Sequence, residues 1–173
     1  AVSDGDGHLR TTRTVAPAFL LHLSPTLQAR LWGDWTDADY YTSDLPAEQD
    51  RDGVILRAGL VFGVDLGSGW SLAPHVGFAQ YDADGDDYDH RDWVAGLAVS
   101  TPELVGCVFS PSVSYTRAAY QHEDSVSGFV EKRDDRIWRF AFSVTVRELE
   151  GVIGYSPSMT ITFLDHKSNL EPY

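Results

Sequence analysis

The feature that most constrains this chain is the repeat of hydrophobic side chains at every second position. Between residues 51 and 67, the even positions from Val54 to Leu66 are all apolar, while Gly and Arg recur at the odd ones. Side chains of a β-strand alternate between two faces, so this period predicts a strand. A turn at 67–69 and a second alternating run over 70–78 complete a predicted hairpin. The same alternation recurs at 15–23, 27–35, 93–99, 105–115, 138–146 and 153–163, which predicts an all-β, antiparallel fold of about eight strands.

The second face of these strands decides between a soluble domain and a membrane barrel. It carries small polar residues, as at Ser110, Ser112 and Ser114. A soluble β-domain would expose many Lys, Glu and Asp there, whereas the lumen of a membrane barrel is polar and crowded. The larger polar residues predicted to face this lumen are Arg30, Arg57, His75, Arg139 and Arg147. The sequence therefore predicts an antiparallel transmembrane β-barrel of the outer-membrane type with about eight strands visible, and the strand pattern leaves open whether these close alone or form part of a larger barrel.

Loop lengths and charge favour the same class. Short predicted connections at 24–26, 67–69, 100–104 and 148–151 alternate with long ones at 38–52, 82–92 and 119–134. Outer-membrane barrels have short periplasmic turns and longer extracellular loops. The chain has 26 Asp and Glu against 13 Lys and Arg, and the first two long loops hold much of this acidic excess. We therefore expect these loops to face outwards from a bacterial outer membrane.

Aromatic residues cluster where the strands meet the long loops, which is typical of an interfacial belt. The predicted belt contains Trp32, Trp35, Tyr40, Tyr41, Tyr81, Tyr88, Trp93, Tyr115, Tyr120 and Trp138. Outer-membrane lipid and lipopolysaccharide are therefore the expected partners. The acidic balance excludes nucleic acid as a partner. No apolar run approaches the roughly 18 to 20 residues of a membrane-spanning helix, which excludes a helical membrane protein.

One acidic stretch has the alternating carboxylates of a calcium loop. Asp82, Asp84 and Asp86 supply the oxygens, but Asp87 stands where the pattern needs Gly, and no Glu closes the site. A solvated acidic loop is favoured over a metal site, and no cofactor is expected. Weak bridging of Ca²⁺ or Mg²⁺ between these carboxylates and lipopolysaccharide phosphates remains a hypothesis.

Catalysis receives little support from the sequence. His22 and His75 fall on the small-polar face, and a Ser–His pair would be needed for a barrel lipid hydrolase. No G-x-S-x-G motif occurs, so we expect a protein that is not an enzyme. The lumen arginines could set the selectivity of a pore or pair with acids inside a plugged barrel. Cys107, the single cysteine, is predicted to be a small hydrophobe facing lipid.

The last forty or so residues carry short motifs that resemble a known family. An Arg-Asp motif opens a strand at 131–135, a Gly-x-x-Pro hairpin follows at 154–157, and a Ser-Asn pair stands at Ser168 and Asn169. These motifs resemble the C-terminal part of the surface lipoprotein assembly modifier family, and the strand that opens at 51–53 is similar more weakly. The resemblance implies an outer-membrane barrel, preceded by a periplasmic helical-repeat domain, that helps move lipoproteins to the cell surface.

The resemblance also sets expectations for domains and site residues. Residues 1–173 would be a single barrel segment that lacks N-terminal strands and a closing C-terminal strand. Arg133, Asp135, Ser168 and Asn169 would be structural or substrate-path positions, and surface lipoproteins would be the substrates. The alternative is a porin or structural barrel whose acidic loops contact other surface components. A barrel lipid hydrolase is the third and least favoured class.

Overall fold

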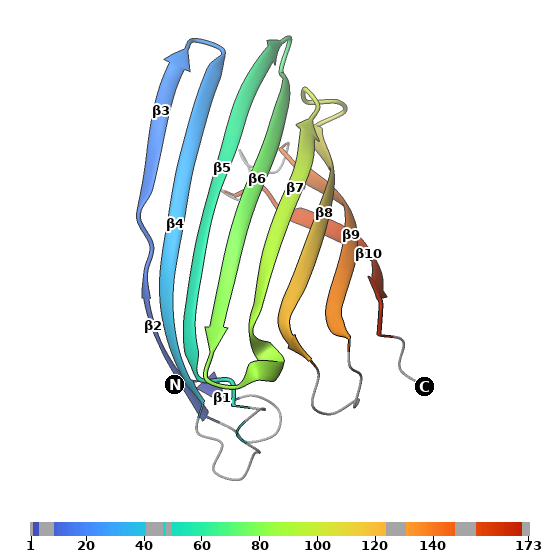
Figure 1. Cartoon of the computed structure of the whole chain (residues 1–173). Helices are drawn as coiled ribbons and strands as arrows, with labels where there is room; N and C mark the ends of the chain where they lie inside the picture. Colours follow the sequence, from blue (N-terminus) through green and yellow to red (C-terminus); the bar gives the residue numbers. More distant parts are fainter. Residues whose placement is uncertain are drawn as a thin grey trace.

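The computed structural model describes residues 2–3, 9–40, 47, 50–123, 131–147 and 155–170. These residues form one antiparallel sheet in the order β1-β2-β4-β5-β6-β7-β8-β9-β10, with β3 also paired to β4 (Figure 1). The strands are β1 (Val2–Ser3), β2 (Leu9–Val15), β3 (Ala18–Ser24), β4 (Leu27–Tyr40), β5 (Gly53–Gly67), β6 (Trp70–Ala83), β7 (His90–Ser100), β8 (Cys107–Glu123), β9 (Lys132–Val146) and β10 (Ser158–Ser168). A 3-10 helix, η2 (Asp86–Tyr88), connects β6 to β7.

The predicted all-β, antiparallel class is confirmed. Each predicted alternating run overlaps one of the strands β3 to β10. The start of the last run is wrong, because β10 begins at Ser158, and Ile153 lies outside the described residues. The alternation of apolar residues does not predict β2, whose Thr and Arg side chains form no apolar row. Thr is nevertheless a strand-forming residue, and β2 extends the edge of β4 beyond the interruption at Pro17.

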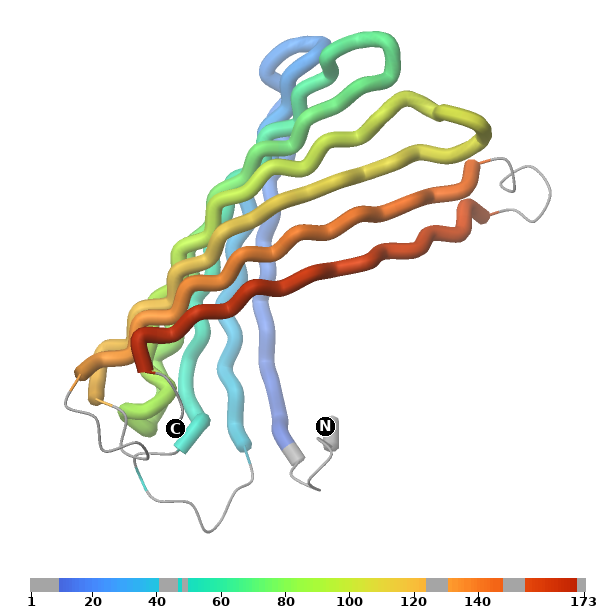
Figure 2. Tube along the Cα trace, turned by 90° about the vertical axis from the view of Figure 1, so that its right-hand side faces the viewer, coloured from blue at the N-terminus to red at the C-terminus, as the bar shows by residue number. Residues whose placement is uncertain are grey.

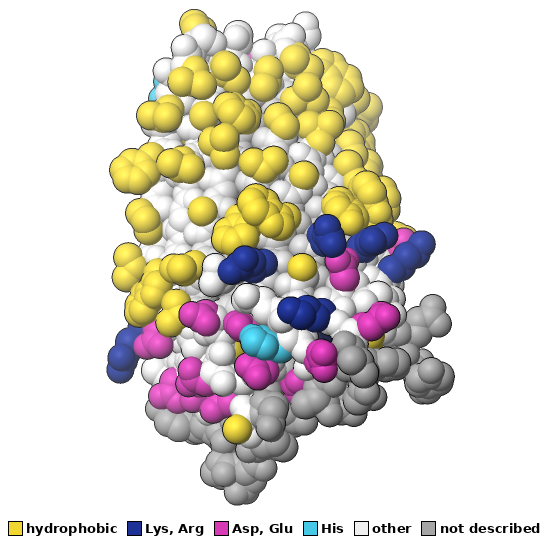
Figure 3. All heavy atoms as spheres, in the orientation of Figure 1, with side chains coloured by type: hydrophobic (Ala, Val, Ile, Leu, Met, Phe, Trp, Pro, Cys, Tyr) yellow, Lys and Arg dark blue, Asp and Glu magenta, His cyan; other side chains and the backbone are white. Residues whose placement is uncertain are grey.

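The register sorts the side chains into two faces. Phe163, Phe140, Val113, Leu97 and Pro74 lie opposite one another on β10, β9, β8, β7 and β6. We call the face that carries this row the apolar face, and the other the polar face. Phe163 is 65% exposed and Phe140 47% exposed, so nothing in the described sheet covers the apolar face. Hydrophobic side chains spread over most of it in Figure 3.

The described part of the chain has no conventional core. Its buried hydrophobic residues are all alanines, namely Ala29, Ala38, Ala79 and Ala118. A soluble β-domain would bury large side chains between two layers. This sheet instead stands as a single curved layer in which β9 and β10 bend away from the viewer of Figure 1, and Figure 2 shows the same bend from the side. The apolar face is therefore the convex one.

The sheet is open among the described residues. β10 pairs only with β9 at one edge, and β1, β2 and β3 lie at the other. Closure into a barrel therefore stays a prediction. Tight turns join β3 to β4 and β5 to β6 at one end, whereas acidic side chains gather at the opposite end (Figures 1 and 3). No helix within the described ranges is both long and apolar enough to span a membrane.

Large side chains of the polar face lie over glycines of the neighbouring strand. A Cβ atom built on Gly59 would come within 2.6 Å of the Trp32 ring, and one on Gly96 within 2.5 Å of the His75 ring. The pairs Trp32–Gly59 and His75–Gly96 are direct cross-strand neighbours. The glycines in the alternating pattern therefore make room for rings on the same face.

Candidate functional site

The candidate site lies on the polar face, at the acidic end of the sheet. One register row crosses this face as Asp34, Arg57, Ala79, Asp92, Ala118, Asp135 and Ser168. Arg57 Nη1 lies 3.1 Å from Asp34 Oδ1, so this arginine is paired. A polar hollow of about 320 Å³ adjoins the pair and is lined by Thr14, Thr36 and Arg10 as well. The row places charges of both signs on a face that the alternation predicted to be polar.

Aromatic rings form a continuous stack beside this row. The rings of Tyr81 and His90 are stacked with centroids 4.0 Å apart, and those of His90 and Tyr120 follow at 4.8 Å. Arg57 lies 5.6 Å from the centroid of Tyr81, and Arg133 lies 4.8 Å from that of Tyr120. An arginine therefore closes each end of the stack by a cation–π contact. This aromatic ladder joins five adjacent strands, β5 to β9.

The ladder corrects part of the predicted aromatic belt. Tyr81 and Tyr120 share the polar face with Arg57 and Asp135, so they do not lie on the side that the apolar rows occupy. Trp32 also lies on the polar face, over Gly59. Trp35, Trp93, Tyr115 and Trp138 do lie on the apolar face, in register with its rows. Tyr41 lies outside the described residues. The parity of each aromatic position along its strand separates the two groups.

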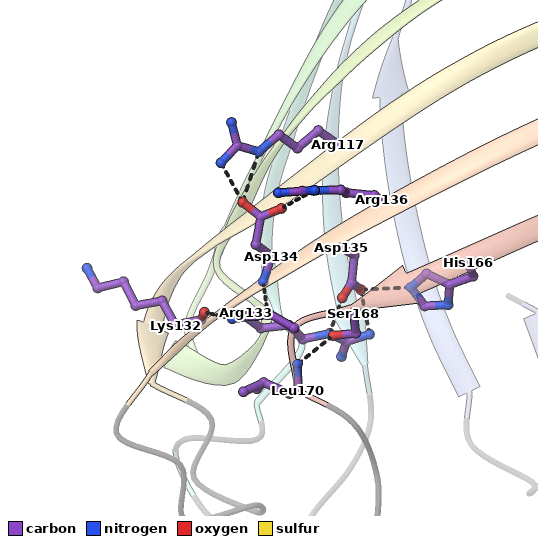
Figure 4. Close-up of polar contacts among 10 residues, drawn as sticks. Arg117, Lys132, Arg133, Asp134, Asp135, Arg136, His166, Ser168 and Leu170 are labelled. Carbon is purple, nitrogen blue, oxygen red and sulfur yellow. Dashed lines mark hydrogen bonds and ion pairs between the residues drawn. The ribbon is translucent and has the colours of Figure 1, made fainter.

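Asp135 is the most buried charged residue of the site. Its side chain is 5% exposed. Arg133 binds it with both ends of the guanidinium fork, Nε at 3.0 Å from Oδ1 and Nη2 at 2.6 Å from Oδ2. His166 Nε2 lies 3.2 Å from Oδ2, and the Ser168 hydroxyl also hydrogen-bonds to the carboxylate (Figure 4). The carboxylate thus has partners on its own strand and on β10.

Asn169 holds the end of β10 against the start of β9 through hydrogen bonds to the backbone of β9. Its side-chain oxygen accepts the Asp134 N–H at 2.6 Å, and its Nδ2 donates to the Lys132 carbonyl at 2.9 Å. The Asn169 N–H donates to the Asp134 carbonyl. All four motif positions, Arg133, Asp135, Ser168 and Asn169, therefore meet where the start of β9 faces the end of β10. We call these four residues together with His166 the motif corner.

The predicted lumen residues occupy defined places. Arg30, His75 and Arg139 fall on one register row of the polar face, separated by Val61, Gly96 and Ser114. Arg30 and Arg139 are exposed, and neither forms an ion pair with any residue that the structure describes. Arg57 is paired with Asp34 on the other row. Arg147 follows β9, and its N–H donates to the Gly106 carbonyl at 2.7 Å.

The acidic loop does not gather its carboxylates around one point. Asp82, Asp84 and Asp86 are all exposed, and Asp86 lies 3.7 Å from His122. Within the described ranges, no group of three or more His, Cys, Asp or Glu residues is arranged to hold a metal ion. The geometry adds nothing to the divalent-cation hypothesis, which stays a prediction.

Asp52, directly before β5, lies close to other carboxylates at the acidic end of the sheet. Its Oδ1 accepts the Tyr40 N–H at 2.5 Å. Burial, together with repulsion from Asp50, Asp39 and Asp84, raises the pKa of Asp52 in spite of that hydrogen bond. The acidic loops therefore crowd like charges at this end.

Among the residues that the structure describes, no serine pairs with either of the two histidines considered for catalysis. Neither His22 nor His75 hydrogen-bonds to another described residue, and the His75 ring lies over Gly96. Packing between strands accounts for the place of His75. Cys107 is partly exposed and shares the apolar face with Val113.

Comparison with known proteins adds no relative. No protein-family model matches the chain, and no curated protein matches it either. A functional argument for this chain therefore rests on its own residues and geometry.

Proposed function

We propose that the chain is a segment of a bacterial outer-membrane β-barrel that helps to move lipoproteins to the cell surface, without catalysing a reaction. The observation that carries the membrane part of this proposal is the uncovered apolar face. Leu97, Phe140, Phe142, Ile161 and Phe163 all expose more than a third of their surface on one side of a single-layer sheet. Lipid is the solvent that would cover such a face without a second protein layer.

The distribution of charge supports the same orientation. Acidic side chains gather at the end of the sheet away from the tight turns, and Lys and Arg side chains lie between them and the hydrophobic field (Figure 3). Outer-membrane barrels have an apolar band with polar residues beyond both interfaces. The acidic end would then face the exterior and the short turns the periplasm.

The motif corner supports the export part of the proposal. Its four motif positions form two close pairs, Arg133 with Asp135 and Ser168 with Asn169, which lie more than thirty residues apart in sequence and are joined by hydrogen bonds where β9 meets the end of β10. These are the positions whose motifs resemble the surface lipoprotein assembly modifier family, and that resemblance is the ground for the export proposal. Surface lipoproteins are therefore the substrates we propose, and the motif corner would hold the barrel wall beside their path.

Deletion of the gene tests the export function. We expect surface display of a lipoprotein, measured by antibody labelling of intact cells, to be lost, while its total amount in lysed cells stays unchanged. Complementation with the intact gene should restore display. Normal display in the deletion strain would contradict lipoprotein export and leave the barrel class standing.

Two neighbouring arginine substitutions test the membrane face. Phe142 lies on the apolar face and Ala141 on the polar face of β9. In lipid, Phe142→Arg should cost about 2 to 4 kcal/mol of folding free energy, because a charge near the bilayer midplane is expensive. Ala141→Arg should cost much less, and Phe142→Ala measures the loss of the ring alone. The measurement is equilibrium unfolding of the full-length protein in vesicles. Equal costs for both arginine variants would contradict a lipid-facing β9.

A porin is the second candidate, because Arg30 and Arg139 stand exposed on one row of the polar face without ion-pair partners in the described structure. Unpaired cations of this kind attract anions when they line a pore. Normal lipoprotein display in the deletion strain, together with anion-selective conductance of the purified protein in planar bilayers, would favour the porin.

A further inference from the structure

Besides Arg13 on β2 and Lys132, which is paired with Glu123 at the start of β9, four basic residues of β7 to β10 lie on the apolar face next to the acidic end of the sheet. They are Arg91 on β7, Arg117 on β8, Arg136 on β9 and Lys167 on β10. Arg117 lies directly opposite Arg136, and Arg136 directly opposite Lys167, so three cations stand side by side on neighbouring strands. Like charges in direct cross-strand pairs are destabilising. An anion bound beside this row would offset the repulsion between its three cations.

Carboxylates of the protein neutralise only part of this positive charge. Asp134 accepts Arg117 Nε at 2.9 Å, and its Oδ1 lies 3.7 Å from Arg136 Nε (Figure 4). Arg117 and Arg136 still expose 55% and 64% of their side chains, and Lys167 forms no ion pair with a described residue. Asp165 is the other carboxylate on this face of β10. The Lys132 and Glu123 charges cancel, so Arg91, Arg117, Arg136 and Lys167 against Asp134 and Asp165 leave a net charge of about +2 (4 − 2) in a strongly acidic chain.

The surroundings of the row match an amphiphile. Tyr115 and Trp138 lie two residues further along β8 and β9, with ring centroids 4.9 Å apart. The Val113, Phe140 and Phe163 row follows directly. A cavity of about 210 Å³ beside the cations is lined by Arg136, Lys167, Ser168, Asn169 and Asp134. Along β8 to β10, starting from the acidic end, a row of cations is thus followed by a row of aromatic side chains and then by hydrophobic side chains.

We propose that Arg117, Arg136 and Lys167 bind the phosphate head group of an anionic membrane lipid, whose acyl chains lie along the apolar face of β8 to β10. This inference rests on the proposed membrane location, because the chains need that face in a bilayer. The cations would neutralise the phosphate, while Tyr115 and Trp138 would lie at the level where head group and chains join. The bound lipid would also relieve the repulsion within the cation row.

Binding of short-chain lipids to the full-length protein in detergent tests the proposal. The probes are dihexanoyl phosphatidic acid, dihexanoyl phosphatidylcholine with the same chains, and inorganic phosphate. We expect phosphatidic acid to bind best. Arg136→Gln combined with Lys167→Gln should weaken its binding about thirtyfold, since each basic residue near an anionic lipid surface is worth about 1 kcal/mol. Arg13→Gln, which changes an exposed arginine on β2 far from the row, should have no effect.

Misfolding would weaken lipid binding, so a variant that is expected to bind more tightly tests the site independently. Asp134→Asn is such a variant. It removes the carboxylate that competes for the cations, so phosphatidic acid should bind about fivefold more tightly. Equal binding of phosphatidic acid and phosphatidylcholine, or of phosphatidic acid and inorganic phosphate, would overturn the proposal, as would unchanged binding by the double variant. Flotation of the wild-type protein with vesicles is scored separately. Failure to float contradicts the membrane location, whereas flotation with unchanged binding by the double variant contradicts only the lipid site.

Discussion

Replacing Asp135 with Ala is expected to lower the free energy of unfolding of the full-length protein by about 3 kcal/mol. The substitution removes a nearly buried carboxylate and leaves the Arg133 guanidinium without the acceptor that both ends of its fork now contact. It also removes the partner of His166. Breaking a buried ion pair costs more than the pair contributes, because the remaining charge stays desolvated. Arg133 remains 36% exposed, so we expect the lower end of the range for such changes.

Asp134 provides the matched control for this prediction. It is the next residue on β9 and has the same side chain, but it lies on the opposite face, with surface-exposed Arg117 and Arg136 as partners. Asp134→Ala should therefore cost less than Asp135→Ala, because the cations that lose their partner, Arg117 and Arg136, remain more than half exposed and hydrated. Equilibrium unfolding in urea, followed by Trp fluorescence in vesicles, measures both. Equal losses for the two variants would show that burial does not distinguish the two carboxylates.

The strands and their faces could be predicted because alternation is a local signal. Each residue of β5 or β9 reports its face through its immediate neighbours in sequence, and the register then confirms which side chains share a row. β2 was missed because its Thr and Arg residues leave no hydrophobic row to count. Its pairing with β4 comes from backbone hydrogen bonds, which a pattern of side chains does not record.

The motif corner and the aromatic ladder could not be derived from spacing. Asp135 and Ser168 are neighbours only because β9 and β10 pair in one register out of several. A slip by one residue would move Ser168 and His166 to the other face. The ladder depends in the same way on three strand pairings, which bring Tyr81, His90 and Tyr120 into one stack. Register of this kind is a property of the assembled sheet and is set by many contacts at once.

The second substitution with a large expected effect on stability is Gly96→Ala, on the polar face. A Cβ atom on Gly96 would lie 2.5 Å from His75 Cε1 and 2.7 Å from the Val113 carbonyl oxygen. The His75 ring can rotate away, but the carbonyl belongs to the backbone of β8 and cannot move without disturbing the ladder between β7 and β8. Gly96→Ala should therefore lower the free energy of unfolding by about 1 to 3 kcal/mol, the usual cost of overpacking.

Gly63→Ala is the control, because its Cβ would meet only Gln28 side-chain atoms, the nearest at 2.9 Å. A flexible Gln side chain can move aside, and Ala restricts the unfolded chain more than Gly does, so this variant should be neutral or slightly stabilising. Adding His75→Ala to Gly96→Ala should restore part of the loss and leave the part due to the carbonyl. The same urea titration in vesicles measures all three. If Gly96→Ala were as harmless as Gly63→Ala, the close approach of β7 and β8 at this point would be wrong, because no other feature of Gly96 requires a missing side chain.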